Sequence, residues 1–335
     1  MNTSMFYPGT LLLKKEDIAS ILTMADALKA VERAFVLKAE GKTIMPAKIY
    51  LDLPQYHGDF RAMPAYVDGG AGMKWVSVYP ENTQKYGLPS VTGIIIFCDP
   101  RNSYPLAIMG GTYLTTIRTG AAGGVAVKHL ARKDSAVVGM VGAGRQARSQ
   151  LTAIRQVLPS LKEAKVYDQY ADGAVKFAEE MGEELGVTIS AVQSVAEAVD
   201  ADIIVTTTFA TEPVVLKKHV KPGTHINAIG ADAPGKQELE DSLVTSAKII
   251  VDDIDQASHS GEINVPLSKG TIKASDIYCT LGEVAAGMKK GRQKDSEITI
   301  FDSTGLAIQD IICAKLVYEK AKSRAADLTS FDFFH

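Results

Sequence analysis

The feature that most constrains the fold is the stretch VVGMVGAGRQA at residues 137–147. Gly142, Gly144 and Ala147 fit the pattern Gly-x-Gly-x-x-Gly/Ala between an apolar strand-like run and a helix-like run. The first glycine of such a turn permits the tight bend, the second lets the backbone approach a pyrophosphate, and the small third residue lets helix and strand pack closely. The stretch therefore predicts a dinucleotide site, the alternative being a plain glycine turn.

The surroundings of this motif predict a doubly wound α/β domain over residues 126–305. Apolar runs alternate there with amphipathic stretches, as strands buried on both faces of a parallel sheet require. Asp168 ends the next strand-like run, 26 residues after Gly142. A carboxylate there accepts ribose hydroxyls and repels a 2′-phosphate, which favours NAD over NADP, although Arg145 partly offsets it. The predicted strands are AVVGMVGAG, AKVYDQY, DIIVTTT, HINAIGAD, KIIVDD and ITIFDST.

The flanking residues, 1–125 and 306–335, are expected to form a second, α+β domain. The first 40 or so residues read as helices, one of which has Thr23 and Asp26 placed as a capping box and Gly41 as a stop. Residues 44–110 contain short β-rich runs separated by turn residues, and IIIFCD and PLAIMGG read as a hairpin, so this segment is expected to form a mostly antiparallel sheet. A small-residue helix follows at TYLTTIRTGAAGGVAVKHLAR, and a last helix, GLAIQDIICAKLVYEKA, is expected to return to this domain.

Composition excludes several classes of function. The net charge of −3 provides no basic field for nucleic acid or an anionic membrane, and no apolar stretch approaches the roughly 20 residues of a membrane span. The N-terminus has no signal-peptide pattern. Three widely spaced cysteines and six histidines without metal spacing predict a reducing, cytoplasmic setting and no metal site.

Four cations lie in apolar contexts ahead of the nucleotide motif: Lys48, Arg61, Lys74 and Arg118. A single lysine in a strand usually points to solvent, but together these four suit a small anion such as a carboxylate. Asp232, in GADAPGK, is an acid at a nucleotide-facing strand end and is either a helix cap or a proton-transfer group.

These residues resemble the ornithine cyclodeaminase/mu-crystallin family, and within it the archaeal-type alanine dehydrogenase branch. The resemblance spans nearly the whole chain. It implies a Rossmann domain, an N-terminal domain that binds substrate and forms a homodimer, NAD(P), and small α-amino, α-imino or α-keto acids. It rests on the stretches MPAKIYLD, GDFRAMPAY, GMKWV, YLTTIRTGAAGG, VGAGRQA, THINAIGADAPGKQEL, SGEIN and ITIFDSTGLAIQD.

The resemblance also implies roles for single residues. Lys74 matches the family's proton-transferring lysine, and Asp232 matches its catalytic aspartate. Lys48 matches a basic residue that meets the substrate, and Arg118 an arginine between substrate carboxylate and cofactor phosphate. Thr208 and Ser303 have plain strand-end caps as their alternative. The cofactor-contacting positions, besides Arg118, Gly142 and Gly144, are Ser90, Thr119, Arg145, Gln146, Asp168, Thr208, Ile226, Asn227, Ala228, Ile229, Lys236 and Ser303.

Arg61 distinguishes branches of the family. Ornithine cyclodeaminases carry an acidic residue there, which meets the cationic end of ornithine. An arginine would repel that ammonium by about 4 kcal/mol at an illustrative 4 Å and an effective dielectric of ~20. We therefore expect Arg61 to be buried and forked onto a substrate carboxylate, the alternative being a surface arginine paired with Asp59.

The function that the sequence favours is NAD-dependent oxidation of a small amino acid, first of all L-alanine, NAD and water to pyruvate, ammonia and NADH. Reduction of cyclic imines or ketimines and ornithine cyclodeamination are the enzymatic alternatives. A non-catalytic ligand-binding protein like mu-crystallin is the alternative of another class. The intact set of Lys74, Arg118 and Asp232 argues against that last alternative, since binding alone needs no acid/base pair.

Overall fold

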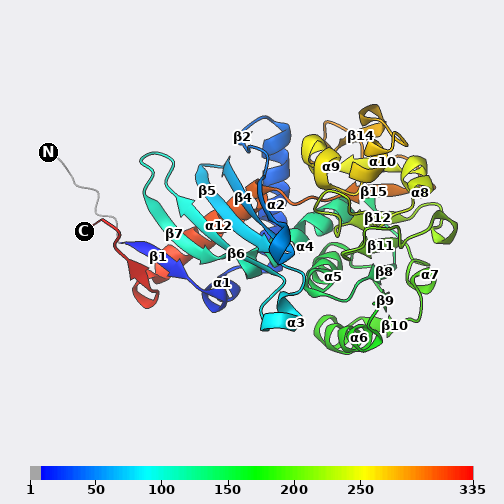
Figure 1. The fold of residues 1–335 in the computed structure, drawn as a ribbon, viewed down its shortest axis with the longest axis horizontal. Helices are drawn as coiled ribbons and strands as arrows, with labels where there is room; N and C mark the ends of the chain where they lie inside the picture. The colour runs from blue at the N-terminus through cyan, green and yellow to red at the C-terminus, as the bar shows by residue number, and fades with distance from the viewer. Residues whose placement is uncertain (1–8, 335) are drawn as a thin grey trace. The chain divides into compact units, whose positions relative to one another are not determined.

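The computed structural model describes residues 9–334, and the chain divides into two compact units (Figure 1). Unit 1 combines the N-terminal residues up to Ala30 with Gly41–Arg118 and the segment from Leu306 onwards. Unit 2 combines Val31–Glu40 with Thr119–Gly305. Two helices continue from one unit into the other, because α2 (Met24–Ala39) and α4 (Gly111–Leu130) contain the points of division.

Unit 1 is built on an eight-stranded sheet in the order β16-β1-β7-β6-β5-β4-β2, with β3 also paired to β4. Every pair is antiparallel except β1 with β7, which confirms the prediction of a mostly antiparallel sheet and of a hairpin between β6 and β7. The strands are β1 Thr10–Leu13, β2 Thr43–Ile44, β3 Ile49–Leu53, β4 Gly58–Val67, β5 Gly70–Val78, β6 Val91–Cys98, β7 Pro105–Gly110 and β16 Ser330–Phe331.

Helix α12 (Ala307–Ala321) packs on strands β4, β5, β6 and β7, and Figure 1 shows it lying across this sheet. The last predicted helix does return to the first part of the chain, because α12 belongs to unit 1. The remaining short elements of unit 1 are α1 Lys15–Ile21, η1 Pro54–Tyr56, α3 Asn82–Tyr86 and η4 Lys322–Asp327.

The expectation that the first 40 residues are helical is wrong at β1. Leu11, Leu12 and Leu13 pair in register with Ala107, Ile108 and Met109 of β7, and Thr10 and Leu11 pair with β16 on the other side. A three-leucine run carries no periodicity that separates strand from helix. The partners that decide between the two lie about 95 and 320 residues further along the chain.

The capping box predicted ahead of α2 is present. The Thr23 hydroxyl accepts from the Asp26 backbone N–H at 3.2 Å, and the Asp26 carboxylate accepts from the Thr23 N–H and hydroxyl at 3.4 and 2.7 Å. Gly41, with φ of +68°, follows this helix in the left-handed region that ends many helices.

Unit 2 is built on an eight-stranded, all-parallel sheet in the order β10-β9-β8-β11-β12-β15-β13-β14. All six predicted strands are present, whereas the edge strands β10 and β14 were not predicted from the sequence. The strands are β8 Val137–Val141, β9 Glu163–Tyr167, β10 Thr188–Ala191, β11 Ile203–Thr206, β12 His225–Ala228, β13 Lys248–Val251, β14 Ile277–Thr280 and β15 Thr299–Asp302.

Helices cover both faces of this sheet, as Figure 1 shows for α5 and α7. One apolar core lies between β8, β9, α5 and α6 and includes Phe177 and Met140, and a second lies around β12, β13 and α8. The helices are α5 Arg145–Val157, α6 Ala171–Leu185, α7 Val195–Ala198, η2 Lys217–His219, α8 Asp241–Ser246, α9 Ile254–Ser260, α10 Asn264–Ser268, η3 Ala274–Asp276 and α11 Leu281–Ala285.

The strand order of unit 2 reverses between β8 and β11. Parallel sheets bind ligands at the carboxyl ends of the strands on either side of such a point. Gly142, which follows β8, has a φ of +100°, and a Cβ there would lie 2.8 Å from the Thr207 hydroxyl beyond β11. The glycine is therefore required both by the backbone conformation and by the close approach of the two strand ends.

Two findings concern residues 9–334 as a whole. None of the helices there is long and apolar enough to cross a membrane. Within the same range, no three His, Cys, Asp or Glu side chains gather as a metal site would require.

Candidate functional site

A buried charged centre lies inside unit 1, between the sheet and two helices. Lys74 Nζ on β5 is 2.8 Å from Asp310 Oδ2 on α12, and Arg118 Nε on α4 donates to Asp310 Oδ1 at 2.8 Å. Arg118 also donates to Gln309 Oε1 at 2.8 Å. Side-chain exposure is 1% for Lys74, 6% for Arg118 and 0% for Asp310. The Asp310 carboxylate is thus shared by Lys74 and Arg118, two of the four cations that were predicted to bind a small anion.

This environment lowers the pKa of Lys74 to about 7. Burial is the largest cause, and the positive charges of Arg118 and Lys48 act in the same direction, whereas Asp310 opposes them. A lysine with a pKa near 7 exchanges its proton readily at neutral pH, which is the property required of a general acid or base.

The register of the sheet explains why the cations gather. Met63 of β4 pairs directly with Lys74 of β5, and Arg61 pairs with Val76, so Arg61 and Lys74 lie on one face as diagonal neighbours. Tyr50 of β3 pairs with Arg61 on the same face. Lys48, which precedes β3 by one residue, is half-buried, and its charge reaches Lys74.

Arg61 is buried, as expected, with 4% exposure, but its fork is turned toward a residue of its own strand. Nε donates to Asp59 Oδ1 at 2.7 Å and NH2 donates to Asp59 Oδ2 at 3.0 Å. The guanidinium also lies 5.2 Å from the centre of the Tyr50 ring. Asp59 therefore accepts from two of the five guanidinium N–H groups. The expected burial and the alternative of pairing with Asp59 occur together.

Sequence reasoning missed Gln309 and Asp310. Both are fully buried on α12, and the Gln309 Nε2 atom has no hydrogen-bond partner in residues 9–334. The available signal was a polar pair inside the apolar run GLAIQDIICA, since an acid on the buried face of a helix requires a cationic partner. Lys74 and Arg118 are those partners.

The dinucleotide motif of unit 2 forms the expected strand–turn–helix. Helix α5 begins at Arg145 with Gly144 as its N-cap, and Ala147 is fully buried against the sheet. The Asp168 carboxylate, beyond β9, accepts from the Ala143 N–H at 2.8 Å and from the Tyr170 N–H at 2.9 Å. The predicted acid is therefore anchored to the glycine turn itself.

The groups at this turn fit a bound dinucleotide. A Cβ placed on Gly144 would meet no atom within 4 Å, so the backbone faces open space where a pyrophosphate would lie. The 13-residue helix α5 directs its amino end there, and Arg145 is exposed beside it. The buried Gln146 Oε1 has no partner among the described residues, which leaves an acceptor for a ligand hydroxyl.

Asp232 lies on the loop that follows β12, residues 229–237, which we call the Asp232 loop. Its Oδ1 is 2.6 Å from Lys236 Nζ, and that ammonium lies 4.9 Å from the centre of the Phe209 ring. Asn264 accepts from the Gly235 N–H and donates to the Lys236 carbonyl, both at 3.0 Å. The loop thus brings together Asp232 and Lys236, which were predicted separately as a catalytic residue and a cofactor contact.

The other residues that were predicted to contact the cofactor differ in burial and in hydrogen bonding. Thr208 is half-buried beyond β11, and Ser303 is buried beyond β15, where its N–H donates to the Ala228 carbonyl. Asn227 directs its side chain into the core of unit 2, toward Gly123 and His225. Buried side chains also occur at Thr119, Ile226, Ala228 and Ile229, whereas Ser90, in unit 1, is half-buried with its hydroxyl 3.2 Å from that of Thr83.

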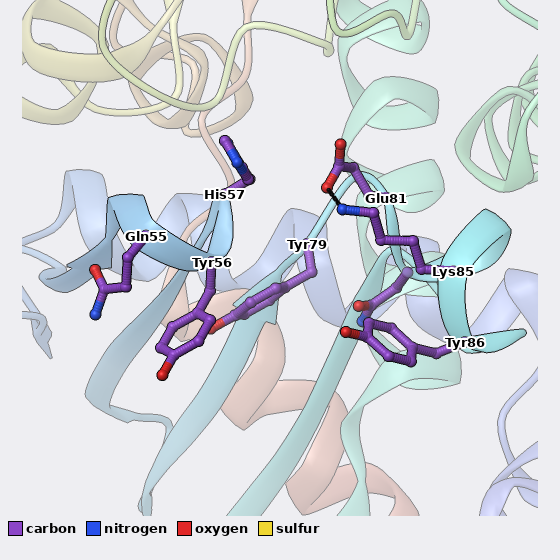
Figure 2. Close-up of a pocket in the computed structure, with 8 residues that line it drawn as sticks. Gln55, Tyr56, His57, Tyr79, Glu81, Lys85 and Tyr86 are labelled. Carbon is purple, nitrogen blue, oxygen red and sulfur yellow. Dashed lines mark hydrogen bonds and ion pairs between the residues drawn. The ribbon is translucent and has the colours of Figure 1, made fainter.

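Figure 2 shows a separate pocket of about 290 Å³ on unit 1. Tyr56, Tyr79 and Tyr86 project into it, beside the ion pair between Glu81 and Lys85. None of the residues predicted from the sequence lines it. This pocket and the charged centre around Lys74 are therefore two different sites of unit 1.

Known proteins support the assignment of this chain. The model of the ornithine cyclodeaminase/mu-crystallin family matches residues 9–325. An alanine dehydrogenase of Archaeoglobus fulgidus is 52% identical over 94% of this chain and 96% of its own length.

Solved structures agree. An archaeal alanine dehydrogenase dimer with bound NAD has a TM-score of 0.93 and 50% identity, over 97% of this chain and 99% of that one. The Δ1-pyrroline-2-carboxylate reductase of Thermococcus litoralis, in complex with NADH and L-proline, has a TM-score of 0.92 and 42% identity, over 94% and 98%. This chain belongs to the ornithine cyclodeaminase/mu-crystallin family.

Proposed function

We propose that this protein is an NAD-dependent alanine dehydrogenase, which converts L-alanine, NAD⁺ and water into pyruvate, ammonium, NADH and a proton. Membership of the family supports the coarser statement, an NAD-dependent oxidoreductase. The substrate is the finer part of the proposal. Unit 1 supplies the groups that hold the amino acid, and unit 2 supplies the dinucleotide turn.

The observation that carries the proposal is the buried set of Lys74, Arg118 and Asp310. Arg118 is a permanent cation suited to a carboxylate, and Lys74 has a pKa of about 7. A protein that only bound a carboxylate would gain from a fully charged lysine. Lowering the pKa of that lysine is useful where a proton must be passed.

The roles of the residues follow from this chemistry. NAD⁺, when bound, accepts the hydride from the substrate Cα. Neutral Lys74 takes a proton from the substrate ammonium, so that the amine lone pair can form the C=N bond as the hydride leaves. Asp232 takes a proton from the water that attacks this iminium carbon, returns it to the nitrogen of the carbinolamine, and takes up the hydroxyl proton as ammonia leaves and the carbonyl of pyruvate forms. Arg118 and Arg61 hold the carboxylate throughout.

Ornithine cyclodeamination is disfavoured by the state of Asp59. The terminal ammonium of ornithine would need a carboxylate there that is not already paired with a cation. The Asp59 carboxylate already accepts two hydrogen bonds from the Arg61 guanidinium, at 2.7 and 3.0 Å. Binding ornithine there would break a charge-assisted pair and bring two cations together.

Reduction of a cyclic imine is the second candidate. It is favoured by the likeness to a Δ1-pyrroline-2-carboxylate reductase in complex with NADH and L-proline. The same carboxylate-binding cations and the same lysine would serve, and the reaction would need no water to attack the imine. The two functions differ in whether ammonia is a substrate.

One experiment separates these candidates. NADH oxidation is measured with pyruvate plus ammonium and with Δ1-pyrroline-2-carboxylate, and NADH formation with L-alanine, L-proline and L-ornithine. A kcat/KM for pyruvate that exceeds that for the cyclic imine, with an absolute requirement for ammonium, is the expected result. Preference for the cyclic imine without ammonium would replace alanine dehydrogenase by the second candidate.

We also propose a homodimer formed through the outer face of the sheet of unit 1. The register places Ile49, Ala62, Trp75 and Ile94 in one row across four strands, and Ile49, Trp75 and Ile94 are 65, 38 and 52% exposed. A contiguous apolar row of this kind on a sheet face is typical of a surface that a second copy covers. The neighbouring archaeal alanine dehydrogenase is a dimer.

A further inference from the structure

A buried glutamate closes the base of the Asp232 loop. Glu238 Oε2 accepts from the Gly230 N–H at 2.9 Å, and Gly230 lies where the chain leaves β12. Glu238 itself lies where the chain returns, so this bond joins the two ends of the segment that carries Asp232 and Lys236. Glu238 has 0% exposure.

The same carboxylate also fixes the end of the neighbouring strand. Its Oε1 accepts from the Thr208 N–H at 2.6 Å and the Thr208 hydroxyl at 2.8 Å, and its Oε2 accepts from the Thr206 hydroxyl at 2.6 Å. A Cβ on Gly230 would lie 2.3 Å from the Thr208 carbonyl oxygen and 2.5 Å from Glu238 Oε1. Glycine at position 230 therefore permits the contact between the two strand ends.

The stretch SGEIN, residues 260–264, contacts the segment by which the chain leaves the Asp232 loop. The Glu262 carboxyl accepts from the Glu238 N–H at 3.0 Å and from the Leu239 N–H at 2.6 Å. Burial raises the pKa of both glutamates, and the charge of Glu238 raises that of Glu262 further, to well above its usual range. Glu238 has donors directed at both of its carboxylate oxygens, from Thr206, Thr208 and Gly230.

We propose that Glu238 is a positioning residue for Asp232: it joins the ends of β11 and β12 and so fixes where the Asp232 loop presents its carboxylate. The proposal rests on the proposed function, in which Asp232 activates water. The buried SGEIN stretch also has a role in this proposal. Glu262 accepts from the Glu238 N–H and Asn264 donates to the Lys236 carbonyl, so both side chains hold the segment that leaves the loop.

Glu238→Gln is the sharpest test, because it changes no more than one oxygen. Both carboxylate oxygens accept a backbone N–H, from Thr208 and from Gly230. A glutamine offers one oxygen and one NH2 group, so in either orientation one of these N–H groups faces a donor. The side chain at position 238 then loses one of these two backbone hydrogen bonds, to Thr208 or to Gly230, while its volume is kept.

Asp202→Asn is the control. Asp202 Oδ2 accepts from the Ala136 and Val137 N–H groups at 2.8 and 3.1 Å, and Oδ1 accepts from Arg132 at 2.7 Å, so the change removes a charge pair at the amino ends of the strands, away from the Asp232 loop. Both variants are expected to lower Tm. Asn264→Ala is a second variant, outside the loop, that removes the side chain bonded to Gly235 and Lys236. If Glu238→Gln does not fold, it tests whether fixing the loop sets kcat.

The measurements are kcat, KM, the Kd of NADH by fluorescence, Tm, and hydrogen exchange of peptides covering residues 229–239. In Glu238→Gln we expect kcat to fall about 10- to 100-fold, the loop amides to exchange faster, and the Kd of NADH to change less than about threefold. Asp202→Asn is expected to keep kcat and loop exchange.

Unchanged kcat and unchanged loop exchange in a folded Glu238→Gln would overturn the proposal. An equal loss of kcat in Asp202→Asn would also overturn it, by making general destabilisation the cause. A wild-type protein that turns over none of the amino or imino acids would instead refute the proposed function. Loop exchange in Glu238→Gln would still decide whether Glu238 anchors the loop.

Discussion

Lys74 and Arg118 come from a strand and a helix of unit 1 and share the carboxylate of one residue, Asp310, at 2.8 Å each. The arrangement makes the charge of Lys74 depend on its neighbours. Burial and Arg118 favour the neutral amine, and Asp310 favours the ammonium. A substitution of Asp310 on α12 should therefore change the pKa of Lys74 on β5.

Asp310→Asn should move the pH profile of alanine oxidation to lower pH. If neutral Lys74 is the base, log kcat/KM rises with pH through about 7. Removing Asp310 removes the charge that raises the pKa of Lys74, so the midpoint falls. Asp68→Asn, which breaks the surface pair with Lys315 on the same helix, should leave the midpoint in place. A midpoint in Asp310→Asn that stays or rises would contradict this account.

Asp232→Asn should lower kcat about 100-fold or more while NADH still binds, because general acid–base groups contribute ~10²–10⁴-fold. Steady-state kinetics and NADH fluorescence titration measure the two quantities. Asp255→Asn, at the exposed start of α9, is the control. Near-normal turnover in Asp232→Asn would reduce the residue to a structural partner of Lys236.

Arg61→Ala should raise KM for pyruvate at least tenfold and leave the Kd of NADH nearly unchanged, since charge-assisted hydrogen bonds contribute about 1.5–3 kcal/mol each. Arg61→Lys keeps the charge but loses the planar fork, so its KM should lie between those of the wild type and the alanine variant. In the structure Asp59 already accepts from two N–H groups of Arg61, so Arg61 has a protein partner besides the proposed substrate carboxylate. If Arg61→Ala leaves KM unchanged, Arg61 serves the Asp59 pair alone.

The wild-type protein should prefer NAD to NADP, and Asp168→Ser should narrow the preference. The Asp168 carboxylate is fixed on the Ala143 N–H at 2.8 Å, where it would repel a 2′-phosphate. The ratio of kcat/KM values for the two cofactors is the measurement. Asp172→Ser, four residues further along the chain and exposed, should keep the wild-type ratio. Equal use of both cofactors by the wild type would refute this role of Asp168.

Ile94→Lys should turn a dimer into a monomer, because it places a charge in the exposed apolar row of unit 1. Light scattering at micromolar concentration gives the mass of each form. Ile254→Lys introduces the same charge at an exposed isoleucine of unit 2 and should remain dimeric. A monomeric wild type would refute the dimer.

The sequence predicted the interior of the parallel sheet better than its edges. Strands such as β8 and β11 are apolar on both faces, and their residues are almost entirely buried. At the edge, β10 (TISA) alternates between exposed and half-buried positions and lacks a continuous apolar run. Its pairing with β9 is what makes it a strand.

The candidate site was predictable where a residue's own neighbours in sequence reveal it. Asp168 could be found by its spacing from Gly142, and the cations by their apolar contexts. Asp310 also lies in an apolar context, but that context does not reveal its role, because the partners that explain it lie 192 residues away at Arg118 and further at Lys74. Glu238 was hidden for the same reason, since its importance depends on the contact between two strand ends.

The return of α12 to unit 1 has a consequence for how the chain is made. Residues 119–305 of unit 2 are continuous in sequence, so most of this unit can assemble as soon as it leaves the ribosome. Lys74 and Arg118 are synthesised before unit 2 is completed, whereas Asp310 follows Arg118 by 192 residues. Until α12 has been synthesised, the two cations have no shared anion to be buried with, so the charged centre of unit 1 can form only after residues 119–305 of unit 2 have been made.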